Sequence, residues 1–325
     1  MKKLVASLAL ATSLAVLPQV AGAQNWPERT ISMIVPFSAG GPTDTVARLD
    51  AEAMSRDLGQ QVIVENVGGA GGTVGAARVA AADPDGYTLL LHHIGMATSA
   101  VLYRKLAYNP LESFEYAGLV TEVPMTIIAR PDFPADDLQG LIAHVKENAD
   151  DVTYANAGIG AASHLCGMLF MSEIDTQLTT VPYQGTGPAM TDLLGGQVDF
   201  MCDQTTNTTS QIQAGAVKAY AVTSAERLEQ LPELPTAAEG GLASMQFGIW
   251  HGLYAPKGTD AAIVERLSQS LQVALKDQNV IDRFAALATT PEPQENATPA
   301  ALRAKVESEI ARWRPLIEAA GVYAD

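Results

Sequence analysis

The residues best suited to chemistry form two glycine-rich turns, each lying between a strand-like and a helix-like segment. The first turn contains Phe37, Ser38, Ala39, Gly40 and Gly41, and the second contains Gly158, Ile159, Gly160, Ala161 and Ser163. The first N–H groups of a helix lack intrahelical partners and carry partial positive charge, so a turn that leads into a helix attracts anions. A single turn of this kind is equally an ordinary strand-to-helix connection. The second copy favours a pair of anion-binding turns.

Four other polar residues lie where strand-like segments end. His92 and His93 follow one such segment, Asp203 follows another, and Thr186 lies in a loop before a helix-like run. Adjacent histidines on a strand point to opposite faces, so at most one is expected to face a cleft. A histidine near an anion acts as a hydrogen-bond donor. From its position, Asp203 is consistent with an exposed acid at the end of a strand.

Several other chemistries are not supported by the sequence. His144, His164 and His251 are scattered, and no H-E-x-x-H motif is present, so we predict no metal site. Residues 69–75 fit the dinucleotide fingerprint G-x-G-x-x-G poorly, and we predict no cofactor. There is no G-x-S-x-G motif, and the neighbouring side chains of Ser163 and His164 diverge. The chain is therefore predicted not to be an enzyme.

The segments that position these residues alternate between strand and helix patterns. This alternation predicts an α/β fold with mainly parallel sheets and helices on both faces, whose ligands lie at the carboxyl ends of the strands. Residues 114–130 are long for one strand and read as a connection between domains, and residues 217–222 are the candidate for the return crossing. We predict two lobes with a cleft between them, lobe one from residues 24–124 and 225–325 and lobe two from residues 125–224.

The amino-terminal stretch has the pattern of a secretory signal peptide. Lys2 and Lys3 precede an apolar run over residues 4–17, and Ala21, Gly22 and Ala23 form an A-x-A cleavage site. We predict that residues 1–23 are removed and that the remaining chain is soluble and exported. The formal net charge of −16 argues against nucleic acid or an anionic membrane surface as partner.

The sequence contains two cysteines, Cys166 and Cys202. In an oxidising compartment one bridge is favoured over two buried thiols, which remain the alternative.

Several ordered motifs across the chain resemble the Bug (TctC-type) periplasmic solute-binding proteins, which serve tripartite tricarboxylate transporters. The resemblance covers residues 36–44, Glu65-Asn66 with residues 69–72, residues 85–89, Tyr183-Gln184-Gly185, residues 193–199 and residues 234–241. One departure is Ala39, where the family commonly has proline.

The resemblance implies a periplasmic-binding-protein (flytrap) fold, with two doubly wound βα lobes joined by two crossing strands. It also implies that a small carboxylate is gripped between the two glycine turns, largely by backbone groups and waters. The far end of the ligand then falls to His92, His93, Met96, Thr98, Thr186 and Asp203. In relatives an acid at the position of Asp203 can meet a ligand amino group, which is the alternative to an exposed strand-end acid. A flat ring would be flanked by apolar Phe37, Ile94, Ile159 and Met96, so our expectation is an aromatic dicarboxylate such as terephthalate. An aliphatic di- or tricarboxylate such as citrate is the alternative.

The expected partners are this ligand and the membrane components of the transporter, with the chain a monomer in the periplasm. A sensor role toward a membrane signalling protein is a further alternative.

Overall fold

The computed structural model describes residues 25–324; the predicted signal peptide, residues 1–23, lies outside them. The amino-terminal third of the chain forms the first strands of the sheet and the helices that pack around them. These elements are β1 (Ile31–Val35), α1 (Pro42–Leu58), β2 (Val62–Asn66), the 3₁₀ turn η1 (Ala70–Gly72), α2 (Thr73–Ala80), β3 (Thr88–His93) and α3 (Gly95–Leu102). β1 pairs in parallel with both β2 and β3.

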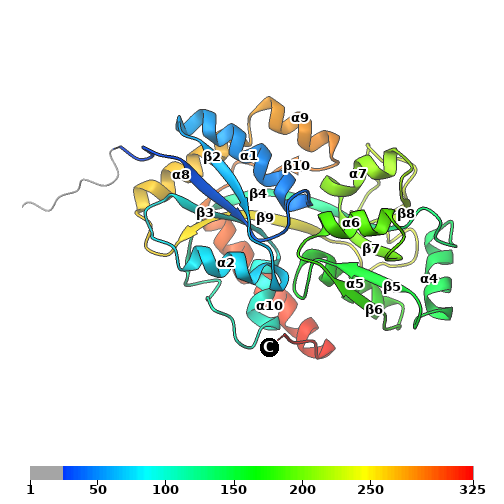
Figure 1. Ribbon diagram of the computed structural model, residues 1–325. Helices are drawn as coiled ribbons and strands as arrows, with labels where there is room; N and C mark the ends of the chain where they lie inside the picture. The colour runs from blue at the N-terminus through cyan, green and yellow to red at the C-terminus, as the bar shows by residue number, and fades with distance from the viewer. Residues whose placement is uncertain (1–24, 325) are drawn as a thin grey trace, which may run out of the picture.

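The middle of the chain builds a second βα unit, seen on the right of Figure 1. It contains the long strand β4 (Phe114–Ala129), α4 (Leu138–Glu147), β5 (Thr153–Asn156), α5 (Ala162–Glu173), β6 (Thr179–Pro182), α6 (Thr186–Leu194), β7 (Phe200–Gln204), α7 (Thr205–Gln213) and β8 (Lys218–Val222). β5 pairs in parallel with β6 and β7. The carboxyl ends of these strands face the first unit.

The last part of the chain returns to the first unit. It forms β9 (Gly248–Pro256), α8 (Ala261–Ala274), α9 (Gln278–Ala286), the short β10 (Thr290–Pro291) and α10 (Pro299–Ala320). β9 lies antiparallel between β3 and β4. We call the unit built on β1, β2, β3 and β9 lobe one, and the unit built on β5 to β8 lobe two.

One strand belongs to both lobes. Residues 114–124 of β4 pair with β9, and residues 125–129 pair with β7 and β8, so the strand order β2-β1-β3-β9-β4-β7-β5-β6 is continuous. The parallel pairing predicted from the sequence holds among β1, β2 and β3 and among β5, β6 and β7, whereas β4, β8 and β9 pair antiparallel with their neighbours.

The prediction that residues 217–222 form the return crossing was wrong. These residues form β8, which pairs with the lobe-two half of β4 because their apolar side chains pack in that lobe's core. The chain instead returns through residues 223–247. There Thr223 accepts a hydrogen bond from the N–H of Met125 (2.9 Å) and donates to the carbonyl of Phe247 (2.7 Å), which ties both crossings together.

Local sequence signals explain where the helix that follows the first glycine turn starts and stops. α1 begins with Pro42 at its first position, where a missing N–H costs nothing, and ends before Gly59, which adopts the left-handed conformation (φ 70°).

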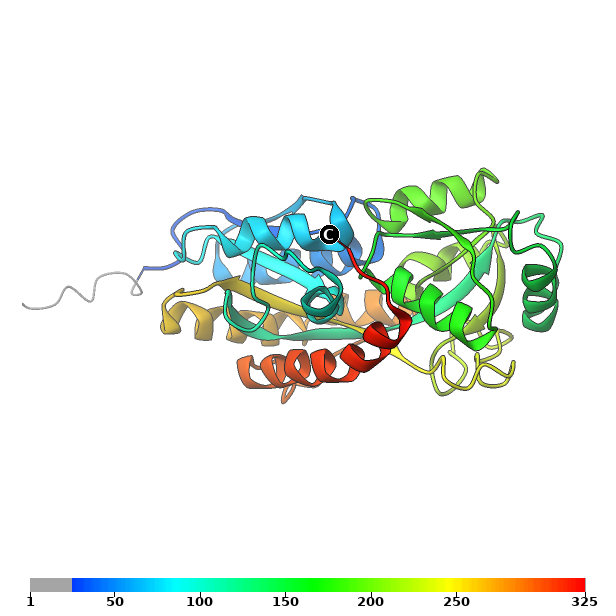
Figure 2. The ribbon, with the colours of Figure 1, turned by 90° about the horizontal axis from the view of Figure 1, so that it is seen from below.

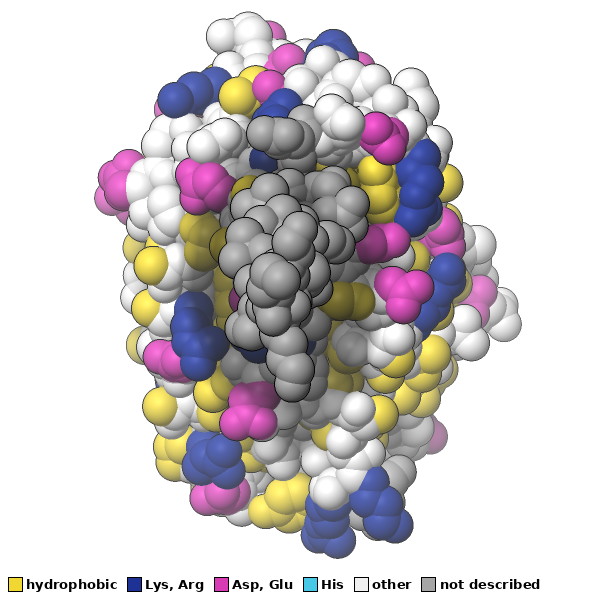
Figure 3. All heavy atoms as spheres, turned by 90° about the vertical axis from the view of Figure 1, so that its left-hand side faces the viewer, with side chains coloured by type: hydrophobic (Ala, Val, Ile, Leu, Met, Phe, Trp, Pro, Cys, Tyr) yellow, Lys and Arg dark blue, Asp and Glu magenta, His cyan; other side chains and the backbone are white. Residues whose placement is uncertain are grey.

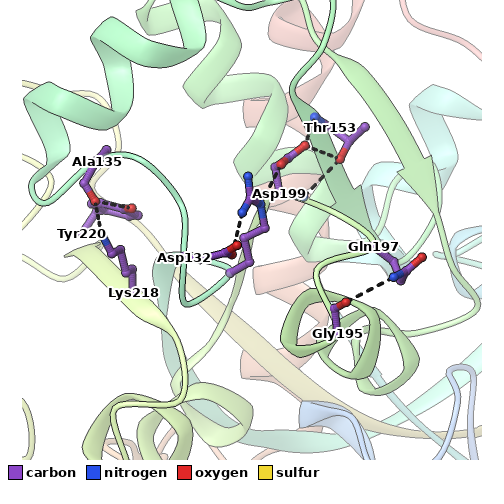
Figure 4. Close-up of polar contacts among 9 residues, drawn as sticks. Asp132, Ala135, Thr153, Gly195, Gln197, Asp199, Lys218 and Tyr220 are labelled. Carbon is purple, nitrogen blue, oxygen red and sulfur yellow. Dashed lines mark hydrogen bonds and ion pairs between the residues drawn. The ribbon is translucent and has the colours of Figure 1, made fainter.

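The end of lobe two that faces away from lobe one is held by a polar cluster around Asp199 (Figure 4). The carboxylate of Asp199 accepts hydrogen bonds from the N–H and hydroxyl of Thr153 (both 2.8 Å) and from Arg130 Nε (3.0 Å). Burial raises the pKa of Asp199, but these hydrogen bonds and the Arg130 charge outweigh it and hold the pKa below its usual range. These contacts hold together the ends of β4, β5 and β7 that lie far from the cleft.

Charged side chains are dispersed over the end of lobe one that faces away from lobe two. Figure 3 shows basic and acidic side chains interspersed on the visible part of this face, without a patch of one sign. Among residues 25–324, no helix combines the length and apolarity required to cross a bilayer.

Candidate ligand-binding site

A small cavity of about 20 Å³ lies where the two glycine turns meet, which is enough space for about one water molecule. Lobe one lines it with Phe37, Gly41, Pro42, Thr43 and His93, and lobe two lines it with Ala157, Ala162, Ser163, Thr186, Asp203 and Gln204.

Four helices begin at this cavity. Residues of the first turn or of the N-cap position of α1, α5, α6 and α7 all line it. Their first N–H groups lack intrahelical partners, and their dipoles present positive ends to the same point. The cavity therefore suits an anionic group although no Lys or Arg lines it.

The first glycine turn is fixed by Asp44, which lies in the first turn of α1. Its carboxylate accepts hydrogen bonds from the N–H of Gly40 (2.9 Å) and from Asn66 Nδ2 (2.9 Å), and forms an ion pair with Arg48 (2.9 Å). Burial raises the pKa of Asp44, but these interactions prevail and lower it. The nearby guanidinium of Arg48 is thus already paired with a protein carboxylate.

The second glycine turn is fixed by its own lobe. Ser163 Oγ accepts from the N–H of Ala157 (2.9 Å), and Asn156 Oδ1 accepts from the N–H of Gly158 (2.8 Å). The backbone of Gly158 and Gly160 is left-handed (φ 95° and 84°), a conformation that glycine adopts without a steric penalty. Both turns are therefore rigid backbone frames.

The two lobes are in direct contact, so the structure is the closed form. The N–H of Ser38 donates to the carbonyl of Gln184 across the cleft (2.9 Å). A Cβ added at Gly187 would lie 2.8 Å from the carbonyl oxygen of Ala39, which means that the backbones of the two lobes touch there.

His93 is the histidine of β3 that reaches the cavity. Its Nδ1 accepts from the N–H of Gly95 (2.9 Å), so the proton of the neutral ring lies on Nε2. Burial lowers the pKa of His93 to about 3, which leaves the ring neutral at pH 7. Phe37 stacks on this ring with a centroid distance of 4.5 Å. The site thus offers a neutral N–H donor in place of a cation.

His92 and His251 lie behind His93. His92 Nδ1 accepts from the N–H of His93 (2.9 Å), and its buried Nε2 has no hydrogen-bond partner among the described residues. His251 Nε2 lies 3.3 Å from the hydroxyl of Thr43. Burial first, and then the neighbouring histidines, lower the pKa of both rings. Only His93 of this group lines the cavity.

The lobe-two wall carries hydrogen-bond acceptors. Asp203 is buried and accepts from Thr186 Oγ1 (2.9 Å) and Asn207 Nδ2 (2.6 Å). Burial outweighs these hydrogen bonds and raises its pKa to about 6. Beside it, the buried Oε1 of Gln204 has no hydrogen-bond partner among residues 25–324. The wall therefore suits a ligand group that donates hydrogen bonds.

The structure distributes the predicted site residues over three places. Six line the cavity: Phe37, Gly41, His93, Ser163, Thr186 and Asp203. Three line a groove of about 700 Å³ at the cleft mouth: Ser38, Gly158 and Ile159. The others do not line either space: Ala39 and Gly40 are exposed, His92 and Ala161 are buried, and Gly160 faces α3.

Sequence reasoning did not include five of the cavity residues in the site, namely Pro42, Thr43, Ala157, Ala162 and Gln204. Gln204 follows Asp203 at a strand end, and this position was the available signal. Within residues 25–324 no group of three or more His, Cys, Asp or Glu side chains is arranged to hold a metal ion.

Cys166 of α5 and Cys202 of β7 form a disulfide with a Cα–Cα distance of 6.0 Å. The bridge joins two elements whose ends carry Ser163 and Asp203. It therefore ties the second glycine turn to the acceptor wall.

Comparison with known proteins gives a consistent picture. Residues 46–322 match the model of the tripartite tricarboxylate transporter family receptor. The chain is 55% identical over 315 residues to a UPF0065 protein from Agrobacterium vitis, covering 97% of this chain and 91% of the relative.

Two solved structures are similar over their whole lengths. The periplasmic binding protein BugD superposes with a TM-score of 0.90 at 53% identity, covering 92% of this chain and 100% of BugD. MatC from Rhodopseudomonas palustris, solved with bound malate, superposes with a TM-score of 0.87 at 41% identity, covering 90% of this chain and 100% of MatC.

Proposed function

The chain belongs to the tripartite tricarboxylate transporter receptor family, and we propose that it captures a short aliphatic dicarboxylate carrying a hydroxyl or amino group. The observation that carries this proposal is that one cavity has hydrogen-bond donors on one side and hydrogen-bond acceptors on the other. Helix N-termini and His93 offer hydrogen-bond donors, whereas Asp203 and Gln204 offer acceptors.

The donor side suits a carboxylate. Four helix starts and a neutral imidazole N–H supply hydrogen bonds and a positive local potential without a cationic side chain. Local dipoles thus oppose the unfavourable field of a chain whose net charge is −16. MatC was solved with bound malate, which supports a dicarboxylate about as large as malate as the ligand of this chain.

The acceptor side distinguishes the candidate ligands. A second carboxylate placed against Asp203 would meet a like charge and the unpaired oxygen of Gln204, whereas a hydroxyl or ammonium would donate to both.

Terephthalate, the ligand favoured from the sequence, is the second candidate. The feature that supports it is Phe37, whose ring lies at the cavity wall and stacks on His93. Citrate and other aliphatic di- or tricarboxylates complete the alternatives to be tested.

We also propose a location and a mode of action for the protein. The exported chain acts in the periplasm without turning its ligand over, and passes the ligand to the membrane components of its transporter. Lobe one (residues 24–124 and 225–325) and lobe two (residues 125–224) close around the ligand, because only a ligand that contacts both lobes shifts the balance toward closure.

Titration calorimetry with malate, succinate, citrate, adipate, terephthalate and nicotinate tests the ligand class. Malate is expected to bind at least about tenfold more tightly than succinate, which lacks the hydroxyl, because succinate leaves the acceptors unpaired. Tighter binding of terephthalate than of malate would reverse the ranking of the two candidates. Loss of malate uptake on gene deletion supports transport, whereas intact uptake favours the sensor alternative.

A further inference from the structure

The second glycine turn is held from the opposite lobe by α3. Tyr103, just after α3, donates its hydroxyl to the carbonyl of Ile159 (2.9 Å), and Thr98 donates to the carbonyl of Gly160 (2.9 Å). Both hydrogen bonds run from lobe one to lobe two. They exist only when the lobes are closed.

The contact is closely packed as well as hydrogen-bonded. A Cβ added at Gly160 would lie 3.1 Å from Leu102 Cδ1, and one added at Gly71 would overlap the Ile159 oxygen. The Ile159 peptide therefore sits in a lobe-one socket formed by Gly71, Leu102 and Tyr103. Partial burial raises the pKa of Tyr103, so its hydroxyl remains a donor at neutral pH.

The carboxyl-terminal segment holds Tyr103 in place. Ala324 donates its N–H to the carbonyl of Leu102 (2.8 Å) and accepts from the N–H of Arg104 (3.2 Å). The guanidinium of Arg104 lies over the ring of Tyr323 at 4.6 Å. After α10 the chain turns back toward the middle of the molecule (Figure 2), and Ala324 lines the same groove as Tyr103.

We propose that Tyr103 is a latch: a positioning residue, held by the segment 322–324, that fastens the Ile159 peptide in the closed state and slows release of the ligand. A hydrogen bond made only in one of two states adds its free energy to that state alone. The proposal rests on the proposed function only in requiring that a ligand is held by lobe closure.

The test compares Tyr103→Phe with Tyr116→Phe. Tyr116 also donates its hydroxyl to a backbone carbonyl, that of Pro110 (2.6 Å), but both residues belong to lobe one. Stopped-flow dissociation of malate is expected to be about 3- to 10-fold faster in Tyr103→Phe, the equivalent of one hydrogen bond, with little change in association rate. Tyr116→Phe is expected to release malate at the wild-type rate.

A second measurement does not depend on the ligand. Spin labels at Val74→Cys in lobe one and Leu194→Cys in lobe two, both exposed positions, report the distance between lobes in ligand-free protein. Tyr103→Phe is expected to shift the distribution of this distance toward the open form, and Tyr116→Phe is not. A variant ending at Gly321 is expected to behave as Tyr103→Phe does.

The outcomes separate the two proposals. If wild-type protein binds no dicarboxylate, the proposed function fails while the label distances still test the latch. If Tyr103→Phe matches Tyr116→Phe in the label distances, the latch is overturned whatever the ligand. If the shortened variant keeps the wild-type distances while Tyr103→Phe does not, the role of residues 322–324 is overturned.

Discussion

At the scale of single residues, the site combines a buried acid with a buried neutral imidazole. Asp203 has a raised pKa because burial outweighs its hydrogen bonds, and His93 has a lowered pKa for the same reason. Both pKa shifts favour the uncharged form of a side chain at the cavity wall. The closed form without ligand therefore carries a cost at Asp203 that a hydrogen-bond-donating ligand would offset.

Asp203→Asn should stabilise the ligand-free protein at neutral pH and weaken malate binding. A carboxyl whose pKa rises on folding stabilises the fold fully below its unfolded pKa, and this contribution is lost as the pH rises through the folded value. For a shift from 3.8 to about 6 the loss is about 3 kcal/mol at pH 7.5. Urea unfolding of wild type and Asp203→Asn at pH 3.5 and pH 7.5 measures this difference in stability.

The difference between Asp203→Asn and wild type should be largest at pH 7.5 and small at pH 3.5. A difference that does not change with pH would show that Asp203 is not buried in the free protein. The variant keeps the Thr186 hydrogen bond, because the amide oxygen of asparagine also accepts.

At the scale of elements, the glycines of lobe one set how closely lobe two can approach. Gly71 has φ 61°, and a Cβ there would overlap the Ile159 oxygen of the opposite lobe. Gly59, at the end of α1, has a similar φ of 70° but open space around it. A comparison of substitutions at Gly71 and Gly59 therefore separates the effect of backbone strain from the effect of hindered lobe closure.

Gly71→Ala should weaken malate binding roughly 10- to 100-fold, because closure would require the turns to move apart. Gly59→Ala carries the same left-handed strain of roughly 1–2 kcal/mol and should lower only the stability. Calorimetric affinities and urea unfolding of both variants provide the comparison. Equal affinity in the two variants would contradict the closed geometry described for Gly71.

The disulfide between Cys166 and Cys202 acts within lobe two. Replacing both cysteines by alanine should lower the free energy of unfolding by about 3–4 kcal/mol, since the bridge closes a loop of 36 residues in the unfolded chain. Urea unfolding of this variant, with reduced wild-type protein as control, measures the loss. An unchanged midpoint would mean that the bridge contributes nothing to stability.

The elements that sequence reasoning predicted well are those with local signals. The strand-like and helix-like segments predicted on either side of the first glycine turn are β1 and α1, and they follow from apolar runs, glycine and proline. α7 was missed because its sequence is rich in threonine and has little apolar periodicity. Contacts such as the hydrogen bond between Thr126 and Thr208 (2.8 Å) hold it in place, and these come from distant segments.

The cavity was only partly predictable for the same reason. Strand-end positions indicated Asp203, and a strand's alternation indicated that only one of His92 and His93 would reach a cleft. The pairing of Thr43 with His251 joins residues 208 positions apart, and no local pattern encodes it.

At the scale of the whole molecule, the proposed ligand is an anion and the protein that would bind it is acidic. The net charge of −16 repels a dicarboxylate at long range, whereas the helix starts attract it only within the cleft. On the face shown in Figure 3 the acidic side chains are interspersed with basic ones. The repulsion therefore comes from the summed charge of the protein, and added salt is expected to screen it.

The association rate of malate should therefore rise about threefold between 10 and 200 mM salt, with little change in the dissociation rate. Stopped-flow traces at fixed pH measure both rates. A rate that falls with salt would mean that the local field of the helix starts dominates the approach of the ligand.

The path of the chain also has a consequence for the order in which the protein folds. Lobe two is one continuous stretch, whereas β9, the strand between β3 and β4, is supplied only by residues 248–256. As the chain emerges amino terminus first, lobe two can fold while lobe one still lacks this strand. Lobe one is thus the late, long-range step of folding, and its unpaired strand edges are the surfaces that a chaperone would need to shield.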